Sequence, residues 1–155
     1  MPKRTMRRTA ADNDYLHKDF HGALSVGLEY LEQRFGPEGV REYLHRFAAA
    51  FYAPLKADLI ARGLPALKEH FERIYAAEGA TFSIECSAGE LVLRVEECPA
   101  VSHMRRHGYP VASLFYETIR TVNAAICDGT PFSAELAEYD PETGRSVQVF
   151  RGRAA

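Results

Sequence analysis

The chain has 155 residues, of which 46% are apolar and 26% are charged, and its formal net charge is −2. These values are typical of a globular domain, so they exclude disordered and fibrous classes. The small charge gives no basis for expecting a nucleic-acid partner. Three cysteines at irregular spacing argue against a disulfide framework and favour a reducing, cytoplasmic location.

The start of the chain is basic. Polar residues, rather than the apolar run of a signal peptide, follow Lys3, Arg4, Arg7 and Arg8. We therefore expect residues 1–13 to form a basic, flexible tail. No segment approaches the roughly 18 consecutive apolar residues of a membrane-spanning helix, so we expect no membrane partner.

The first half of the chain has helical periodicity. Its first apolar series has the spacing of one helix face and comprises Leu16, Phe20, Ala23, Leu24, Leu28, Leu31 and Phe35. Gly36 ends this helix, and a second helix begins at Pro37 and continues to Gly63, with a kink or split at Pro54. A third helix is expected from about Pro65 to Gly79.

The second half changes to a period of two. Two strands are predicted from inward faces made of Phe82, Ile84 and Cys86 and of Leu91, Leu93 and Val95. A short helix over residues 100–107 and a longer one from about Val111 that stops at Gly129 precede two strands, over 132–139 and 145–151. Hairpin turns between paired strands imply an antiparallel sheet. The sequence therefore predicts an α+β fold, with N-terminal helices followed by a β-β-α-α-β-β unit in a single domain over residues 14–152.

Two histidine pairs have the spacing of metal ligands on a helix. His17 and His21 lie on the first predicted helix, and His103 and His107 repeat the spacing on the short one. Imidazoles one turn apart can bind a single divalent ion, although Lys18 replaces the glutamate that a zinc protease needs. We keep His17 and His21 as candidate metal ligands. The alternative is that both pairs lie on solvated helix flanks, and the sequence itself requires no cofactor.

Cys98 stands between a strand end and a helix start. A helix N-terminus lowers the pKa of a thiol and makes it a better nucleophile, and the alternative is an inert, buried thiol. Glu97 either continues the inward face of its strand, where it needs a partner, or lies in water beyond the strand. Cys86 alternates with Phe82 and Ile84 on a strand, and Cys127 lies beside Ile126 at a helix end, so both are predicted to be buried.

Aromatic residues are frequent on the predicted helices. The set comprises Tyr43, Phe47, Phe51, Tyr52, Phe71, Tyr75, Phe115 and Tyr116. Core packing explains most of it, but buried tyrosine hydroxyls need partners, so some of these residues are expected to line a semi-polar pocket. We name Tyr52 as a candidate substrate-binding residue.

A family resemblance is carried by the stretch from Glu97 to Gly108 and by its continuation through Asn123, Gly129, Glu138, Gly144 and Arg151. They resemble the small-molecule-binding domain named after 4-vinyl reductases, which also senses phenols in bacterial activators. Phenol-sensing members hold zinc with several cysteines, and in this chain Cys98 alone falls at such a place. The resemblance covers about the last 60 residues.

The order of elements, the Cys98-Pro99-Ala100-Val101 motif and the ending at residues 140–150 also resemble the related L-2-amino-thiazoline-4-carboxylic acid hydrolase family. This resemblance implies hydrolytic opening of a cyclic thiazoline-type acid. Members often carry a cysteine where Ser146 stands here.

Such a reaction needs a base for water, a cation for the substrate carboxylate and a proton donor for the leaving sulfur. The clustering at the strand end, together with the resemblance, gives Glu97 or His103 as the base and Arg105 or Arg106 for the carboxylate. Cys98, His17 or His21 would lie around the water. The alternative function is a non-catalytic binding or sensor domain for an aromatic or heterocyclic ligand, in either case with a homodimer as the expected assembly.

Overall fold

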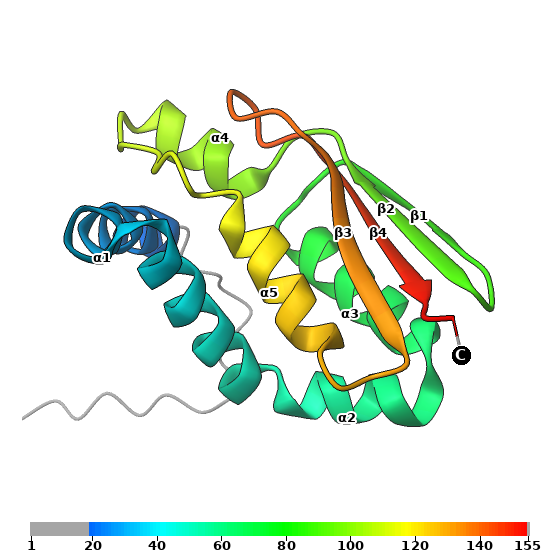
Figure 1. Ribbon diagram of the computed structural model, residues 1–155. Helices are drawn as coiled ribbons and strands as arrows, with labels where there is room; N and C mark the ends of the chain where they lie inside the picture. Colours follow the sequence, from blue (N-terminus) through cyan, green and yellow to red (C-terminus); the bar gives the residue numbers. More distant parts are fainter. Residues whose placement is uncertain (1–18, 155) are drawn as a thin grey trace, which may run out of the picture.

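The computed structural model describes residues 19–154 and has the predicted α+β architecture (Figure 1). Its helices are α1 (Asp19–Phe51), α2 (Ala53–Arg62), α3 (Leu64–Ala77), α4 (Pro99–Arg106) and α5 (Glu117–Cys127). Its strands are β1 (Phe82–Cys86), β2 (Glu90–Val95), β3 (Phe132–Tyr139) and β4 (Ser146–Gly152). The start of the first predicted helix and the tail at residues 1–13 lie outside the described residues.

The four strands form one antiparallel sheet in the order β1-β2-β4-β3. Both predicted hairpins are present, and the loop between β3 and β4 is closed by a hydrogen bond from the Gly144 amide to the Asp140 carbonyl at 2.7 Å. On β2, Leu91, Leu93 and Val95 are buried as the alternation predicted. The sheet therefore presents one apolar face toward the helices.

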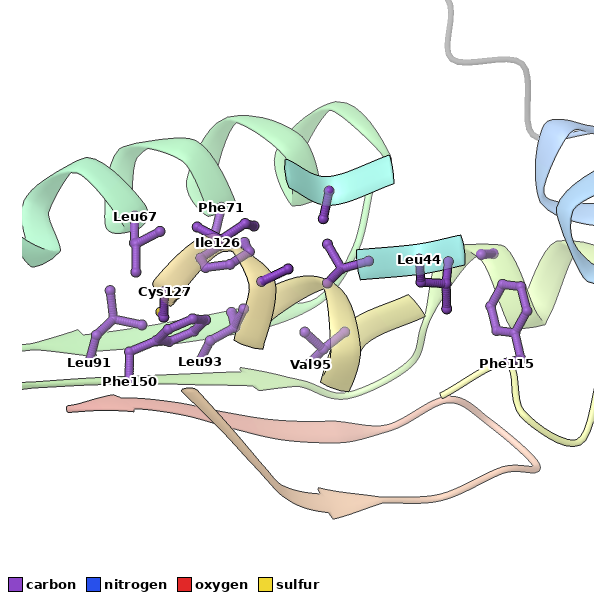
Figure 2. Close-up of a cluster of buried hydrophobic side chains, with 14 of the residues drawn as sticks. Leu44, Leu67, Phe71, Leu91, Leu93, Val95, Phe115, Ile126, Cys127 and Phe150 are labelled. Atoms are coloured by element: carbon purple, nitrogen blue, oxygen red, sulfur yellow. The ribbon is translucent and has the colours of Figure 1, made fainter. Parts of the chain in front are cut away.

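The helices lie in two layers over that face. α3 and α5 contact the sheet directly, and α1 packs on α5 from the other side (Figure 1). Figure 2 shows side chains of α3, α5, β2 and β4 pointing toward one another, among them Phe71, Ile126, Leu93 and Phe150. The opposite face carries ion pairs such as Arg151 with Glu90 and Glu135. The sheet thus packs on the helices through the face that carries Leu91, Leu93 and Phe150.

The long α1 contains a break where the sequence predicted a helix end. Gly36 has φ 70° and ψ −175°, a left-handed φ that glycine adopts without a Cβ penalty. The next predicted break is also present, because α1 ends at Phe51 and α2 begins at Ala53 with Pro54 in its first turn. Glycine and proline chemistry therefore sets the directions of the N-terminal helices.

Two predictions about the second half of the chain, the start of its longer helix and the burial of Cys86, were wrong. The longer helix of the second half, α5, begins at Glu117 and not near residue 111. The Ser25 hydroxyl of α1 accepts a hydrogen bond from the Ala112 amide at 2.8 Å and donates one to the Pro110 carbonyl at 2.8 Å. These bonds hold residues 110–112 against α1 in a non-helical path. Cys86 is exposed rather than buried, since it ends the edge strand β1 beside the turn to β2. Cys127 is buried, as predicted.

None of the helices in residues 19–154 combines the length and the apolar composition that a bilayer crossing needs.

Candidate functional site

A cavity of about 300 Å³ lies where α1, α3, α4 and α5 meet. Its lining comprises His21, Leu24, Tyr43, Leu44, Phe47, Tyr52, Ile74, Tyr75, Glu78, Cys98, Ala100, Phe115, Thr118, Ile119, Val122 and Tyr139. The cavity is bounded by both halves of α1, which diverge at Gly36, and by the helices that cover the sheet. Most of this surface is apolar or aromatic, as in ordinary ligand sites.

Aromatic rings form the wall nearest the end of α1. Tyr43 and Phe47 line the cavity and remain exposed to solvent, so they form its rim. Phe51 stacks on Phe47 with ring centroids 5.3 Å apart, and Tyr52 meets Phe47 edge-on at 6.1 Å. A flat ligand that enters past this rim can stack on ring faces that are already held in place.

Glu78 and His21 form an ion-pair contact in the lining of the cavity. His21 Nε2 is 3.6 Å from Glu78 Oε1, and the Glu78 side chain is only 13% exposed. Glu78 caps the C-terminal end of α3, whereas His21 belongs to the first turns of α1. A partly buried carboxylate favours a hydrogen-bond donor or a positive charge as its neighbour.

Cys98 lies in the same lining, at the N-cap of α4. Its own amide donates to the Thr143 carbonyl at 3.0 Å, which ties it to the β3–β4 loop. Burial raises the pKa of the Cys98 thiol, and this outweighs the lowering by the Val101 and Ala100 amides. The expectation of a thiol pKa lowered by the helix terminus was therefore wrong in direction. At neutral pH Cys98 is a protonated thiol.

Three tyrosines whose pKa values are raised, Tyr52, Tyr75 and Tyr139, line this cavity. Burial raises the pKa of Tyr52 and Tyr75, and it raises the pKa of Tyr139 to about 12. All three hydroxyls therefore stay protonated and can donate hydrogen bonds. The Tyr75 hydroxyl accepts a hydrogen bond from Gln148 Nε2 at 3.3 Å, and Gln148 Oε1 accepts one from Asn123 at 2.8 Å. Buried polar groups of β4 and α5 thus fix the position of Tyr75.

A second, polar hollow of about 190 Å³ lies on the other side of Glu78. It brings together the predicted residues Glu97, His103 and Arg106 with Glu78 itself. Glu97 is exposed and accepts a hydrogen bond from the Ser102 hydroxyl. β2 ends at Val95, so the inward-facing alternative for Glu97 was wrong and the solvent-facing one is correct.

The remaining candidates lie apart from the cavity. Arg105 donates to the carbonyls of Glu142 and Pro141 at 2.8 and 2.9 Å, so its guanidinium holds the β3–β4 loop. The rings of His103 and His107 stand 4.2 Å apart on one face of α4. The predicted site therefore separates into Cys98, Tyr52 and His21 in the cavity, and Glu97, His103 and Arg106 in the polar hollow.

Only one histidine of the candidate metal pair, His21, is among the described residues. His17 lies outside the described residues, and His21 lines the cavity beside Glu78. Within residues 19–154 no three histidine, cysteine or acidic side chains converge in the manner of a metal site. Metal binding by His17 and His21 stays a prediction.

Sequence reasoning missed Glu78. A single glutamate before a glycine at a helix end reads as a solvated residue, and His21, its neighbour in space, is far away in the chain. One signal was present in the sequence. A carboxylate at the C-terminal end of a helix opposes the helix dipole, so a glutamate placed there suggests a role other than helix stabilisation.

Neither a protein-family model nor a curated protein matches the chain. The two family resemblances stay predictions.

Proposed function

We propose that the protein binds a small organic molecule in the cavity lined by Tyr52, Glu78 and Cys98. The observation that carries the proposal is a space of about 300 Å³ with largely apolar, aromatic walls and a few polar groups. Sites for small ligands commonly have this composition. The rings provide stacking surfaces, while the tyrosine hydroxyls and the carboxylate orient the polar atoms of the ligand.

A thermal-shift screen with small aromatic and heterocyclic compounds tests this proposal. We expect a subset of them to raise the melting temperature of the full chain, and Val122→Phe to remove this stabilisation by filling the cavity that Val122 lines. Ile60→Phe is the matched control, because Ile60 is exposed on α2 and does not line the cavity. Equal stabilisation of the wild type and the Val122→Phe variant would contradict binding in the cavity.

Hydrolysis of a cyclic thiazoline-type carboxylic acid at this cavity is the second candidate function. The observation that favours it is the shared lining of Cys98, His21 and Glu78. Water would attack the carbon between nitrogen and sulfur, and the bond from that carbon to sulfur would break. His21 would take one proton from the water, and the other would move from the added hydroxyl to the ring nitrogen. The Cys98 thiol would protonate the leaving sulfur and recover a proton from His21.

Turnover of the thiazoline acid, followed by chromatography, tests the second candidate. Loss of a general base typically lowers the rate by about 100-fold or more, so we expect His21→Ala to have this effect. His107→Ala is the matched control, because His107 is exposed at the C-cap of α4 and does not line the cavity. Binding of the acid without turnover would support the binding function and overturn the hydrolytic one.

We also retain the homodimer as a proposal. β1 and β3 are the edge strands of the sheet, and unpaired strand edges can pair with a second copy. Light scattering of the purified chain checks it, and a monomeric mass at all concentrations would contradict it.

A further inference from the structure

The charge of the cavity is unevenly distributed. Among its described lining residues Glu78 is the sole carboxylate, and no lysine or arginine is present. The one basic side chain in that lining is the imidazole of His21. Arg106 lines the neighbouring polar hollow, and the described ion pairs do not join it to Glu78. A ligand in the cavity therefore meets a partly buried carboxylate without a permanent counter-charge in the described lining.

The influence of Glu78 extends over the cavity. Its negative charge contributes to the raised pKa of Tyr52, of Tyr75 and of Cys98, after the larger effect of burial in each case. These three residues come from different elements and all line the cavity. The charge of Glu78 thus acts on three residues of the lining, and a negative charge in that position favours a positive ligand and disfavours an anion.

The walls suit the same kind of ligand. Tyr43, Phe47, Tyr52, Tyr75 and Phe115 contribute aromatic rings to the lining. The faces of such rings attract an ammonium or guanidinium-like group through their quadrupole, and the attraction increases when water is excluded. Aromatic walls with one partly buried carboxylate combine the two attractions that select an organic cation.

We infer that the ligand of this cavity is a small organic cation, with an ammonium or amidinium nitrogen beside Glu78 and a flat or apolar body against the aromatic wall. This inference rests on the proposed binding function and adds the charge of the ligand. It also argues against the second candidate function, since the carboxylate of a thiazoline-type acid in the cavity would meet Glu78 and no lysine or arginine among the described lining residues.

Three probes of nearly the same shape test the inference by titration calorimetry at neutral pH: benzamidinium, benzamide and benzoate. A charge-assisted hydrogen bond to a buried carboxylate typically adds about tenfold or more in affinity. We therefore expect benzamidinium to bind the full chain at least about tenfold more tightly than benzamide, with benzoate the weakest. Glu78→Gln should remove the difference between benzamidinium and benzamide while retaining the binding of benzamide.

Glu72→Gln is the matched control, because Glu72 lies on the same helix but is exposed and paired with Lys68. It should keep the preference for benzamidinium. Because Glu78 also borders the polar hollow, Val122→Phe serves as a second variant. Loss of benzamidinium binding in that variant supports the cavity, and unchanged binding overturns it.

The outcomes distinguish a failure of the cationic ligand from a failure of the proposed binding function. Equal binding of all three probes, or a preference for benzoate, would overturn the cationic ligand and leave the binding function standing. If no probe binds and the compound screen also gives no stabilisation, both the inference and the proposed function fail. A melting curve of Glu78→Gln that matches the wild type confirms that the comparison is made between folded proteins.

Discussion

The three cysteines differ in their surroundings, and their reactivity should differ accordingly. Cys86 is exposed, whereas burial raises the pKa of Cys98 and raises that of Cys127 to about 11. Because the thiolate is the reactive form, we predict that iodoacetamide labels Cys86 first and the other two much more slowly. Peptide mass spectrometry at successive times measures the order, and Cys86→Ser should remove the fast phase. Rapid labelling of Cys98 would instead indicate an activated thiolate.

His70 should make stability depend on pH. Burial, followed by the charge of Arg73, lowers the pKa of His70 from 6.5 to about 4. As the pH falls from about 6.5, the unfolded chain takes up the proton before the folded one does, so the stability of the fold decreases down to about pH 4. Urea unfolding across this range measures the decrease. His70→Gln should reduce its slope, and His107→Gln, an exposed control, should leave it unchanged.

At the scale of elements, a buried carboxylate joins α1 to α5. The fully buried Glu117 accepts hydrogen bonds from Arg41 of α1 at 3.0 Å, from Thr121 at 2.6 Å, and from Arg120. Burial alone raises the pKa of Glu117, but these bonds together outweigh it and lower the pKa. The negative charge is thus retained inside the interface between the two helices.

We predict that Glu117→Ala lowers the free energy of unfolding by about 3–5 kcal/mol, the usual cost of removing one partner of a buried ion pair. Glu138→Ala is the control, because its ion pair with Arg145 is exposed and should contribute less than about 1 kcal/mol. With a pKa below its ordinary value, Glu117 stabilises the fold above about pH 4.5 and ceases to do so as its folded-state pKa is passed on acidification. Chemical denaturation checks both effects.

The loop between β3 and β4 approaches α4 closely at Gly144. This residue has φ +69°, and a Cβ added to it would overlap the Cys98 Cβ and stand 2.9 Å from the Val101 Cγ2 atom. Two causes of strain act at Gly144, the positive φ and the overlap of the added Cβ. Gly129→Ala has only the first, because Gly129 has φ +74° but no atom within 4 Å of the added Cβ. We predict that Gly144→Ala costs about 1–3 kcal/mol more than Gly129→Ala, from the overlap alone. Equal thermal unfolding of the two variants would show that the loop yields without cost.

At the scale of the whole molecule, the sequence predicted what local chemistry determines. The alternation at Leu91, Leu93 and Val95 and the breaks at Gly36 and Pro54 follow from periodicity and from the backbone limits of two residue types. The start of α5 could not be predicted this way. It depends on hydrogen bonds between Ser25 and residues 110–112, which are distant in the chain.

The same distinction applies to the candidate site. Cys98 and Tyr52 were identifiable because a strand end and an aromatic series mark them in the sequence, and both line the cavity. Glu97 and His103 stand close to Cys98 in the chain, but the fold places them in the polar hollow, and their sequence positions do not reveal this separation. The pairing of Glu78 with His21 arises only when α3 and α1 come together, and no local pattern encodes it.

The break at Gly36 has a consequence for how such a cavity can evolve. The half of α1 before Gly36 contributes His21 and Leu24 to the lining, and the half after it contributes Tyr43, Leu44 and Phe47. The spacing between these two walls is therefore set by the backbone dihedral angles at a residue that does not touch the ligand space. A substitution at Gly36 or in the turn that follows can change the size of ligand accepted while every lining side chain remains the same.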